Sequence, residues 1–177
     1  MSAATPASVK DARLSHVLAC WQRWRAGRRW PARADIDPAD LELLLPGVFM
    51  VQAVGDGGRL RYILAGSQVR NRLGFELTGR HVDELFSGEQ LARLEYAYRV
   101  VLAGQGHHAV HRWNQRGTDI MEYRRMLLPL ADDHATIDTV FGYALYDRLD
   151  GRDAELVQHL SDPVTISVLS ENTVPLD

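Results

Sequence analysis

The sequence predicts an α+β fold in which helices cover one face of a five-stranded antiparallel sheet. The order of the predicted elements is the first reason, because two strands precede a group of helices and three strands follow it. A second reason is the alternation within residues 59–65, where Leu60, Tyr62 and Leu64 share one face, as in a strand with one buried side. Finally, 177 residues with 46% hydrophobic content can bury one core of ordinary size.

The first predicted element is an amphipathic helix that begins between Ala7 and Asp11 and ends near Gly27. Its apolar residues follow the spacing of one helical stripe, and the rest of the surface is basic. The chain's own sheet, the same helix of a second copy, or a signalling enzyme could cover this stripe. We expect a homodimer interface formed by Leu14, Val17, Leu18, Trp21 and Trp24.

A linker and a hairpin follow this helix. Asp37 is placed to cap a short helix that has Pro38 at its first position. Residues 48–54 form a nearly all-apolar strand, and the glycine-rich turn at 55–58 joins it to the strand at 59–65.

A short helix and a turn come next. Ser67 can cap a helix over residues 68–73, and Gly74 supplies the left-handed residue that ends it. Residues 78–80 then form a turn around Gly79.

The second half contains the central helix and three strands. The S-x-x-Q pattern at Ser87 to Gln90 predicts a capping box for a helix that extends to Gly104. The three strands cover residues 107–113, 118–130 and 136–146. We divide the chain into an N-terminal helix (1–30), a central domain (31–148) and an acidic tail (149–177), within which 164–169 could form a further strand.

Several motifs in this order resemble those of PAS sensory domains. Leu73-Gly74, Leu77-Thr78-Gly79-Arg80 and Glu84-Leu85 are similar to the family's pattern between its second strand and its long helix. The chain also resembles the single-domain PAS-like proteins of alphaproteobacteria in the segments at 21–24, 31–38 and 127–130, and the resemblance spans residues 14 to 146. It implies a bacterial sensory module without catalysis, which binds a small molecule, a separate signalling protein or both.

The resemblance also lets the best-known PAS cofactors be tested. Haem-binding members supply an axial histidine from the long helix, whereas residues 89–103 contain none and His81 only lies upstream. The flavin photoreceptor subtype needs a cysteine in the helix after the second strand, and residues 67–73 have none. We therefore expect neither haem nor flavin, and the identity of any cofactor stays open.

The sequence suggests a small-molecule pocket instead. Aromatic residues on neighbouring strands could point toward the central helix, and arginines could anchor an anionic or hydroxylated ligand. Arg125 shares a predicted core face with Tyr123 and Leu127, so its charge needs a partner or a ligand carboxylate. The candidate ligand-binding residues are Tyr62, Arg72, Tyr98, Tyr123, Arg125 and Phe141. Each could instead serve only the core or the surface.

Other sites have weaker support. His107 and His111 are about 13 Å apart along a strand, too far to share one metal ion, so we expect a partly exposed edge strand and no metal site. The single cysteine, Cys20, is expected to be a buried thiol, with a redox switch as the alternative. Asp132-Asp133-His134 is expected to be a hairpin turn, since no catalytic motif accompanies it and a small hydrolase is the less favoured alternative.

Charge and hydropathy address partners and location. Residues 1–33 carry a net charge of +6 and residues 147–177 carry −5, within a total of −3. The acidic tail could neutralise the basic segment, so we expect no nucleic-acid partner for Arg23, Arg25, Arg28, Arg29 and Arg33. The sequence has no apolar run of membrane-spanning length and no secretory signal, which favours a cytoplasmic protein.

Overall fold

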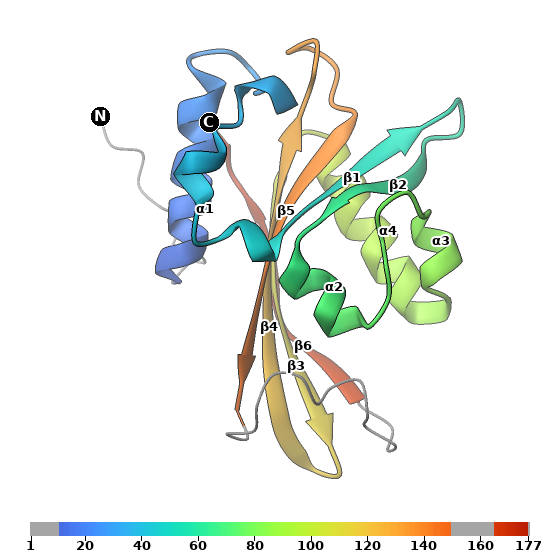
Figure 1. Ribbon diagram of the computed structural model, residues 1–177. Coiled ribbons are helices and arrows are strands. Elements are labelled where there is room, and N and C mark those ends of the chain that lie inside the picture. Colours follow the sequence, from blue (N-terminus) through green and yellow to red (C-terminus); the bar gives the residue numbers. More distant parts are fainter. Residues whose placement is uncertain (1–10, 150–164, 177) are drawn as a thin grey trace.

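The computed structural model describes residues 11–149 and 165–176 (Figure 1). After helix α1 (Ala12–Arg25), three short 3₁₀ helices occupy Arg33–Asp35, Pro38–Leu41 and Leu45–Gly47. The remaining elements are β1 (Val48–Val54), β2 (Arg59–Ala65), α2 (Ser67–Leu73), α3 (Val82–Leu85), α4 (Gly88–Leu102), β3 (Gly106–Gln115), β4 (Thr118–Leu130), β5 (Thr139–Arg148) and β6 (Thr165–Val174).

The strands form one antiparallel sheet in the order β2-β1-β5-β4-β3-β6. Five strands were predicted, and the sixth is β6, from a part of the chain that the sequence left open. Its pairing with β3 extends from Gly106 opposite Val174 to Asn114 opposite Thr165. As a result β3 is an interior strand, and the expectation of a partly exposed edge strand at His107 to Trp113 is wrong.

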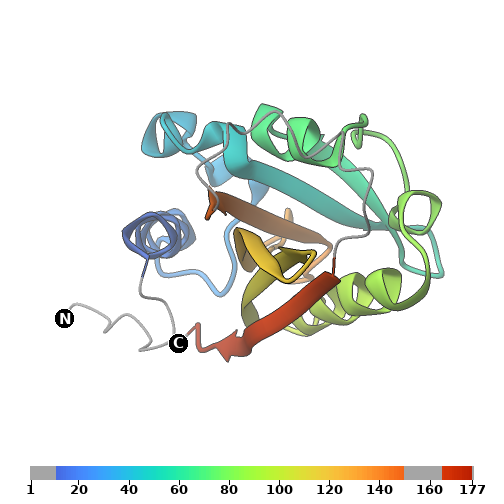
Figure 2. The ribbon, with the colours of Figure 1, turned by 90° about the horizontal axis from the view of Figure 1, so that it is seen from below.

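Helices lie on both faces of the sheet, not on one as predicted. Helix α1 packs on one face and α2 to α4 lie on the other, as the two perpendicular views make clear (Figures 1 and 2). We call these the α1 face and the α4 face. Side chains of β4 point alternately to the two faces. Met126 and Leu128 pack in the core of the α1 face, and Met121 and Leu127 pack in the core of the α4 face.

The apolar stripe of α1 is covered by the protein's own sheet. The five side chains that were predicted to form a dimer interface are at most 5% exposed: Leu14, Val17, Leu18, Trp21 and Trp24. The indole Nε1 of Trp21 donates to the backbone oxygen of Pro129 at 2.8 Å, and Trp24 donates to Asp40 at 2.7 Å. The first bond holds α1 to β4 and the second holds it to the 3₁₀ helix Pro38–Leu41, so the stripe is buried within the chain itself.

Local signals explain most of the element boundaries. Asp37 accepts a hydrogen bond from Ala39 N, as predicted, and Gly74 ends α2 with a φ of 78°. Helix α2 begins one residue earlier than expected, with Gly66 in place of Ser67 at its N-cap. Ser87 is the N-cap of α4, but its side chain makes no capping hydrogen bond, so the predicted capping box is absent.

One close approach depends on a missing side chain. Gly142 in β5 lies opposite Phe49 in β1, and a Cβ added at position 142 would lie 2.2 Å from Cζ of the phenyl ring. The ring therefore rests on bare backbone in the middle of the sheet.

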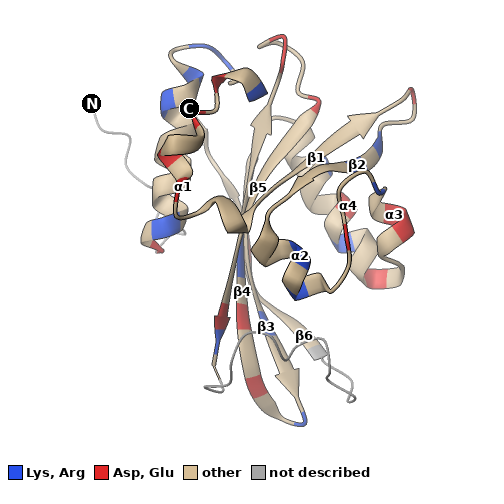
Figure 3. Ribbon diagram, in the orientation of Figure 1, with Lys and Arg blue, Asp and Glu red and all other residues tan. Residues whose placement is uncertain are grey.

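Figure 3 shows basic and acidic residues close together in and around α1, and several of the basic residues have local partners. Arg23 pairs with Asp40 at 2.7 Å, and Arg28 pairs with Asp35 at 2.8 Å. Arg33 pairs with Asp132, which lies in the turn between β4 and β5. These aspartates are not part of the acidic tail, most of which lies outside the described residues. No helix among the described ranges is long and apolar enough to cross a membrane.

Candidate functional site

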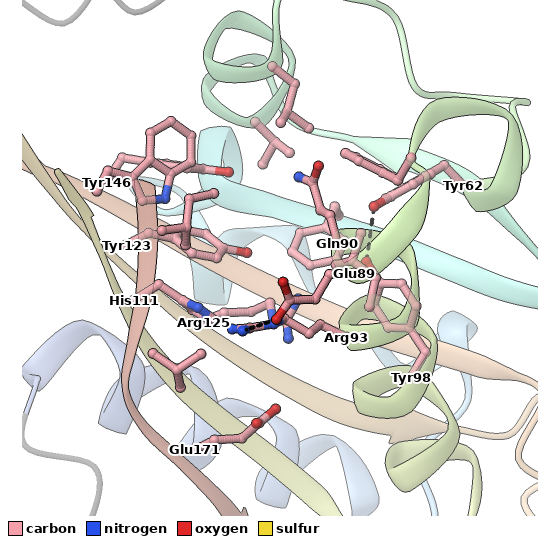
Figure 4. Close-up of a pocket in the computed structure, with 18 residues that line it drawn as sticks. Tyr62, Glu89, Gln90, Arg93, Tyr98, His111, Tyr123, Arg125, Tyr146 and Glu171 are labelled. Carbon is pink, nitrogen blue, oxygen red and sulfur yellow. Dashed lines mark hydrogen bonds and ion pairs between the residues drawn. The ribbon is translucent and has the colours of Figure 1, made fainter. Parts of the chain in front are cut away.

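A cavity of about 480 Å³ lies on the α4 face (Figure 4). The sheet supplies most of its wall, and α2 and α4 supply much of the rest. Its lining residues are Phe49, Tyr62, Val69, Leu73, Phe86, Glu89, Gln90, Arg93, Leu94, Tyr98, His111, Trp113, Tyr123, Arg125, Tyr146, Ile166, Val168 and Glu171. This volume lies within the range that small-molecule sites usually have, and the lining combines apolar, polar and charged side chains.

An aromatic row crosses the sheet along one wall of the cavity. Tyr146, Tyr123 and His111 are successive cross-strand neighbours on β5, β4 and β3. The Tyr123 and Tyr146 rings stack at 4.9 Å with planes 28° apart, and His111 lies 5.5 Å from Tyr123. This row offers a continuous ring surface to the cavity.

The next row of the sheet holds a single large cation between small residues. Arg125 pairs with Ala144 on one side and with Ala109 on the other, and Ala109 pairs in turn with Glu171 of β6. Because both neighbours of Arg125 are alanines, the space beside its guanidinium is not filled by side chains of this row.

The Arg125 guanidinium is desolvated without full compensation. The residue is 3% exposed, and its buried Nε has no hydrogen-bond partner among residues 11–149 and 165–176. Its central carbon lies 5.9 Å from the centre of the Tyr98 ring. Within the same ranges no carboxylate lies within ion-pair distance of it, so one buried N–H remains able to donate to a bound molecule.

Two tyrosine hydroxyls meet at the α4 side of the cavity. Tyr62 Oη and Tyr98 Oη are 3.0 Å apart, and both side chains are buried. Burial raises the pKa of Tyr98 to about 12 and raises the pKa of Tyr62 well above its usual value. Both groups therefore stay neutral at physiological pH, and one donates to the other.

The histidines beside the cavity are held neutral. Burial and the nearby Arg125 charge lower the pKa of His111 to about 4, and its buried Nε2 has no partner in the described chain. Burial and Arg125 also lower the pKa of His107, whose Nε2 lies 2.8 Å from Glu171 Oε1. A neutral His107 can donate this bond, which positions the Glu171 carboxylate at the cavity wall.

A charged pair on α4 marks the outer part of the cavity. Arg93 Nη2 donates to Glu89 Oε1 at 2.5 Å, and both side chains are exposed, Glu89 to 80%. This exposed pair is neutral overall, in contrast to Arg125 in the interior, which has no ion-pair partner among the described residues.

Four of the six predicted ligand-binding residues come together in this cavity: Tyr62, Tyr98, Tyr123 and Arg125. Arg72 does not line the cavity. Its guanidinium lies 5.7 Å from the ring of Tyr146, and Tyr146 is a lining residue. The placement of Phe141 was wrong, because Phe141 lies on the α1 face and packs edge-on against Trp24 at 5.6 Å. Sequence reasoning missed Tyr146, His111 and Glu171 as site residues. Residue parity along β3 was the available signal for His111, whereas Tyr146 and Glu171 needed the register of their strands.

The other candidate groups lie outside this cavity. Cys20 is fully buried in the α1 core, with Sγ 3.4 Å from His16 Nε2, and burial raises its pKa. Asp132, Asp133 and His134 form the predicted turn, in which Asp133 accepts from the backbone of Ala135 and Thr136. The described residues contain no group of three or more side chains suited to hold a metal ion.

Comparison with known proteins gives one family match. The family model described as "PAS domain" matches residues 9–145, which include α1, the helices of the α4 face and most of the sheet. No curated protein matches the chain.

Proposed function

Because the chain belongs to the PAS domain family, we propose that it is a sensory or regulatory module whose cavity on the α4 face binds a small anionic molecule. PAS domains are generally sensory, and the proposal includes no catalytic step. We further propose that the bound state is read by a separate signalling protein.

Arg125 is the observation that carries this proposal. A buried charge is costly unless a partner compensates it, and the described residues leave its Nε without one. A ligand carboxylate would supply both the missing hydrogen-bond acceptor and the opposite charge. The alanines at positions 109 and 144 leave room for such a group next to the guanidinium.

Native mass spectrometry of freshly purified protein is the first test. We expect a retained small molecule, released when the protein is denatured, and a matching loss in the Arg125→Leu variant. Arg99→Leu is the control, since it removes the same charge from an exposed position on α4. The same spectra report whether the protein is the homodimer expected from the sequence, which needs an interface other than the covered stripe of α1.

A thermal-shift panel of small carboxylates and their amides extends this test to weakly held ligands. We expect stabilisation by at least one acid, lost in Arg125→Leu and kept in Arg99→Leu. Equal behaviour of the two variants toward every stabilising compound, or no stabilisation by any acid together with no retained molecule, contradicts the proposal.

A further inference from the structure

Two buried nitrogen atoms that find no hydrogen-bond partner within the described part of the chain belong to residues that line the cavity. They are Nε of Arg125 and Nε2 of His111. Arg125 on β4 pairs with Ala109, and His111 lies two residues further along β3, on the same face of the sheet. Diagonal neighbours of this kind can contact one group placed between them. Both nitrogens can donate to the oxygens of a single ligand group when the His111 proton is on Nε2.

The charge of the cavity favours a monoanion. Arg125 is the interior cation, while Arg93 is already paired with Glu89 toward the outside. Glu171 adds a negative charge to the wall, and its carboxylate lies 2.8 Å from His107 Nε2. A guanidinium matches a carboxylate through two parallel hydrogen bonds. Because Glu171 is also in the lining, a doubly charged phosphate would bring more uncompensated negative charge into this buried setting than a monoanion would.

The shape of the wall favours an aromatic ring. The row of Tyr146, Tyr123 and His111 lies next to the row of Arg125, two residues along each strand. That separation is about 7 Å, so a ring can lie beside Tyr123 while a short carboxylate arm reaches Arg125. Aliphatic and aromatic side chains supply much of the remaining lining: Phe49, Val69, Leu73, Phe86, Leu94, Trp113, Ile166 and Val168.

We propose that the ligand of this cavity is a small aromatic monocarboxylic acid, with its carboxylate held by Arg125 and His111 and its ring against Tyr123 and Tyr146. This inference rests on the proposed function and names the class of molecule sensed. The ring gains offset or edge contacts with the aromatic row, and the carboxylate supplies the acceptor that no described residue offers to the two nitrogens.

Calorimetric titration of the full chain tests the need for the aromatic ring and the need for the carboxylate separately. The probes are benzoate, phenylacetate and 2-naphthoate, compared with cyclohexanecarboxylate, which lacks the aromatic ring, with benzamide, which lacks the charge, and with phenyl phosphate, which carries a dianion. We expect at least one aromatic acid to bind about tenfold or more tightly than each comparator. Equal affinity for cyclohexanecarboxylate overturns the aromatic assignment, and equal affinity for benzamide or phenyl phosphate overturns the carboxylate.

Variants assign each half of the ligand to its residues. Arg125→Lys is expected to weaken the best aromatic acid about tenfold, because an ammonium cannot make the paired hydrogen bonds. Arg124→Lys is the matched control, since Arg124 is the next residue of β4 and pairs with Asp11 and Asp147. Tyr123→Leu is expected to reduce the preference for the aromatic acid over cyclohexanecarboxylate while acid binding persists. Equal effects at positions 124 and 125 overturn the assignment of the carboxylate to Arg125.

The outcomes separate this inference from the proposed function. If native mass spectrometry identifies a retained anion that is not an aromatic acid, or if only cyclohexanecarboxylate or phenyl phosphate binds, the ligand class is wrong and the proposed function stands. If only benzamide binds, or the retained molecule is uncharged, the anionic ligand of the proposed function is wrong as well. If none of the probes binds and no molecule is retained, both proposals fail. Circular dichroism of each variant separates lost binding from lost folding.

Discussion

The two faces of the sheet differ in how completely helices fill them. On the α1 face, Trp21, Trp24 and Phe141 pack into an apolar core beneath helix α1. On the α4 face, the same strands border a cavity of about 480 Å³ that contains a buried arginine and a buried histidine. The difference indicates that the α1 face supplies stability while the α4 face keeps space for a ligand, and measurements on the two faces can test this separation.

The largest effect is expected on the α1 face. Trp21→Ala removes a fully buried indole and its hydrogen bond to Pro129, so we expect a loss of about 3–5 kcal/mol in the free energy of unfolding, measured in urea. Trp113→Ala, at the cavity wall, is the matched change on the other face and is expected to cost clearly less, because its ring is only partly buried. Equal losses would remove the distinction between the faces.

A smaller effect is expected from pH on the α4 face. The folded-state pKa of His111 is about 4, below the ordinary 6.5, so the unfolded chain binds this proton more readily. The contribution of His111 to the free energy of unfolding is therefore fully present above pH 6.5 and is lost as the pH falls toward 4. We expect His111→Phe to reduce the loss between about pH 7 and pH 5 by about 1–2 kcal/mol, measured by urea unfolding at each pH. An unchanged pH dependence in the variant would contradict this assignment.

The hydroxyl pair of the cavity is expected to contribute still less. Tyr62→Phe breaks the 3.0 Å contact with Tyr98 and leaves one buried hydroxyl without this partner. We expect a loss of about 1 kcal/mol in thermal or urea unfolding, at the low end for a buried group that loses a partner, because Tyr98 lines the cavity. Tyr96→Phe serves as the control, because Tyr96 is 58% exposed and its change should leave stability unaltered. A loss as large as that of Trp21→Ala would show that the hydroxyl pair is a main support of the fold.

The smallest effect is expected at the residue that matters most for binding. Arg125→Leu replaces an incompletely compensated buried charge with an apolar side chain, so the ligand-free protein should change by less than about 0.5 kcal/mol. Unfolding of the dialysed variant measures this change. A loss of several kcal/mol would mean that Arg125 has a structural partner, which would weaken its role as a ligand anchor.

Alternation within single strands predicted much of the architecture. The bounds of β4 agree with the predicted strand at 118–130, and those of β2 with the alternation at 59–65. Strand β6 could only be left open, because its position depends on backbone pairing with the distant β3, which its own sequence does not specify. The second helical face was missed for a similar reason, since the stripe of α1 does not specify which surface covers it.

Residues of the candidate site could be predicted where the alternation of side chains along a single strand determines which face they lie on. Arg125 and Tyr123 share a face of β4 with Leu127, and the structure keeps that arrangement. Phe141 failed because its face depends on the register between β5 and β4, where it lies opposite Leu128 on the α1 face. To predict Glu171 as a site residue, one would have needed the register between β6 and β3. Register between strands depends on contacts distant in the sequence, which a periodicity within one segment does not contain.

The contact between Phe49 and Gly142 has a consequence for the size of any bound compound. Phe49 is part of the cavity lining, and its ring lies flat on the backbone of β5 because position 142 has no side chain. A methyl group at that position would push the Phe49 ring into the cavity and reduce the cavity volume. The size of the ligand that fits can therefore change through position 142, which does not itself line the cavity. A homologous chain with alanine in place of this glycine is expected to bind smaller ligands.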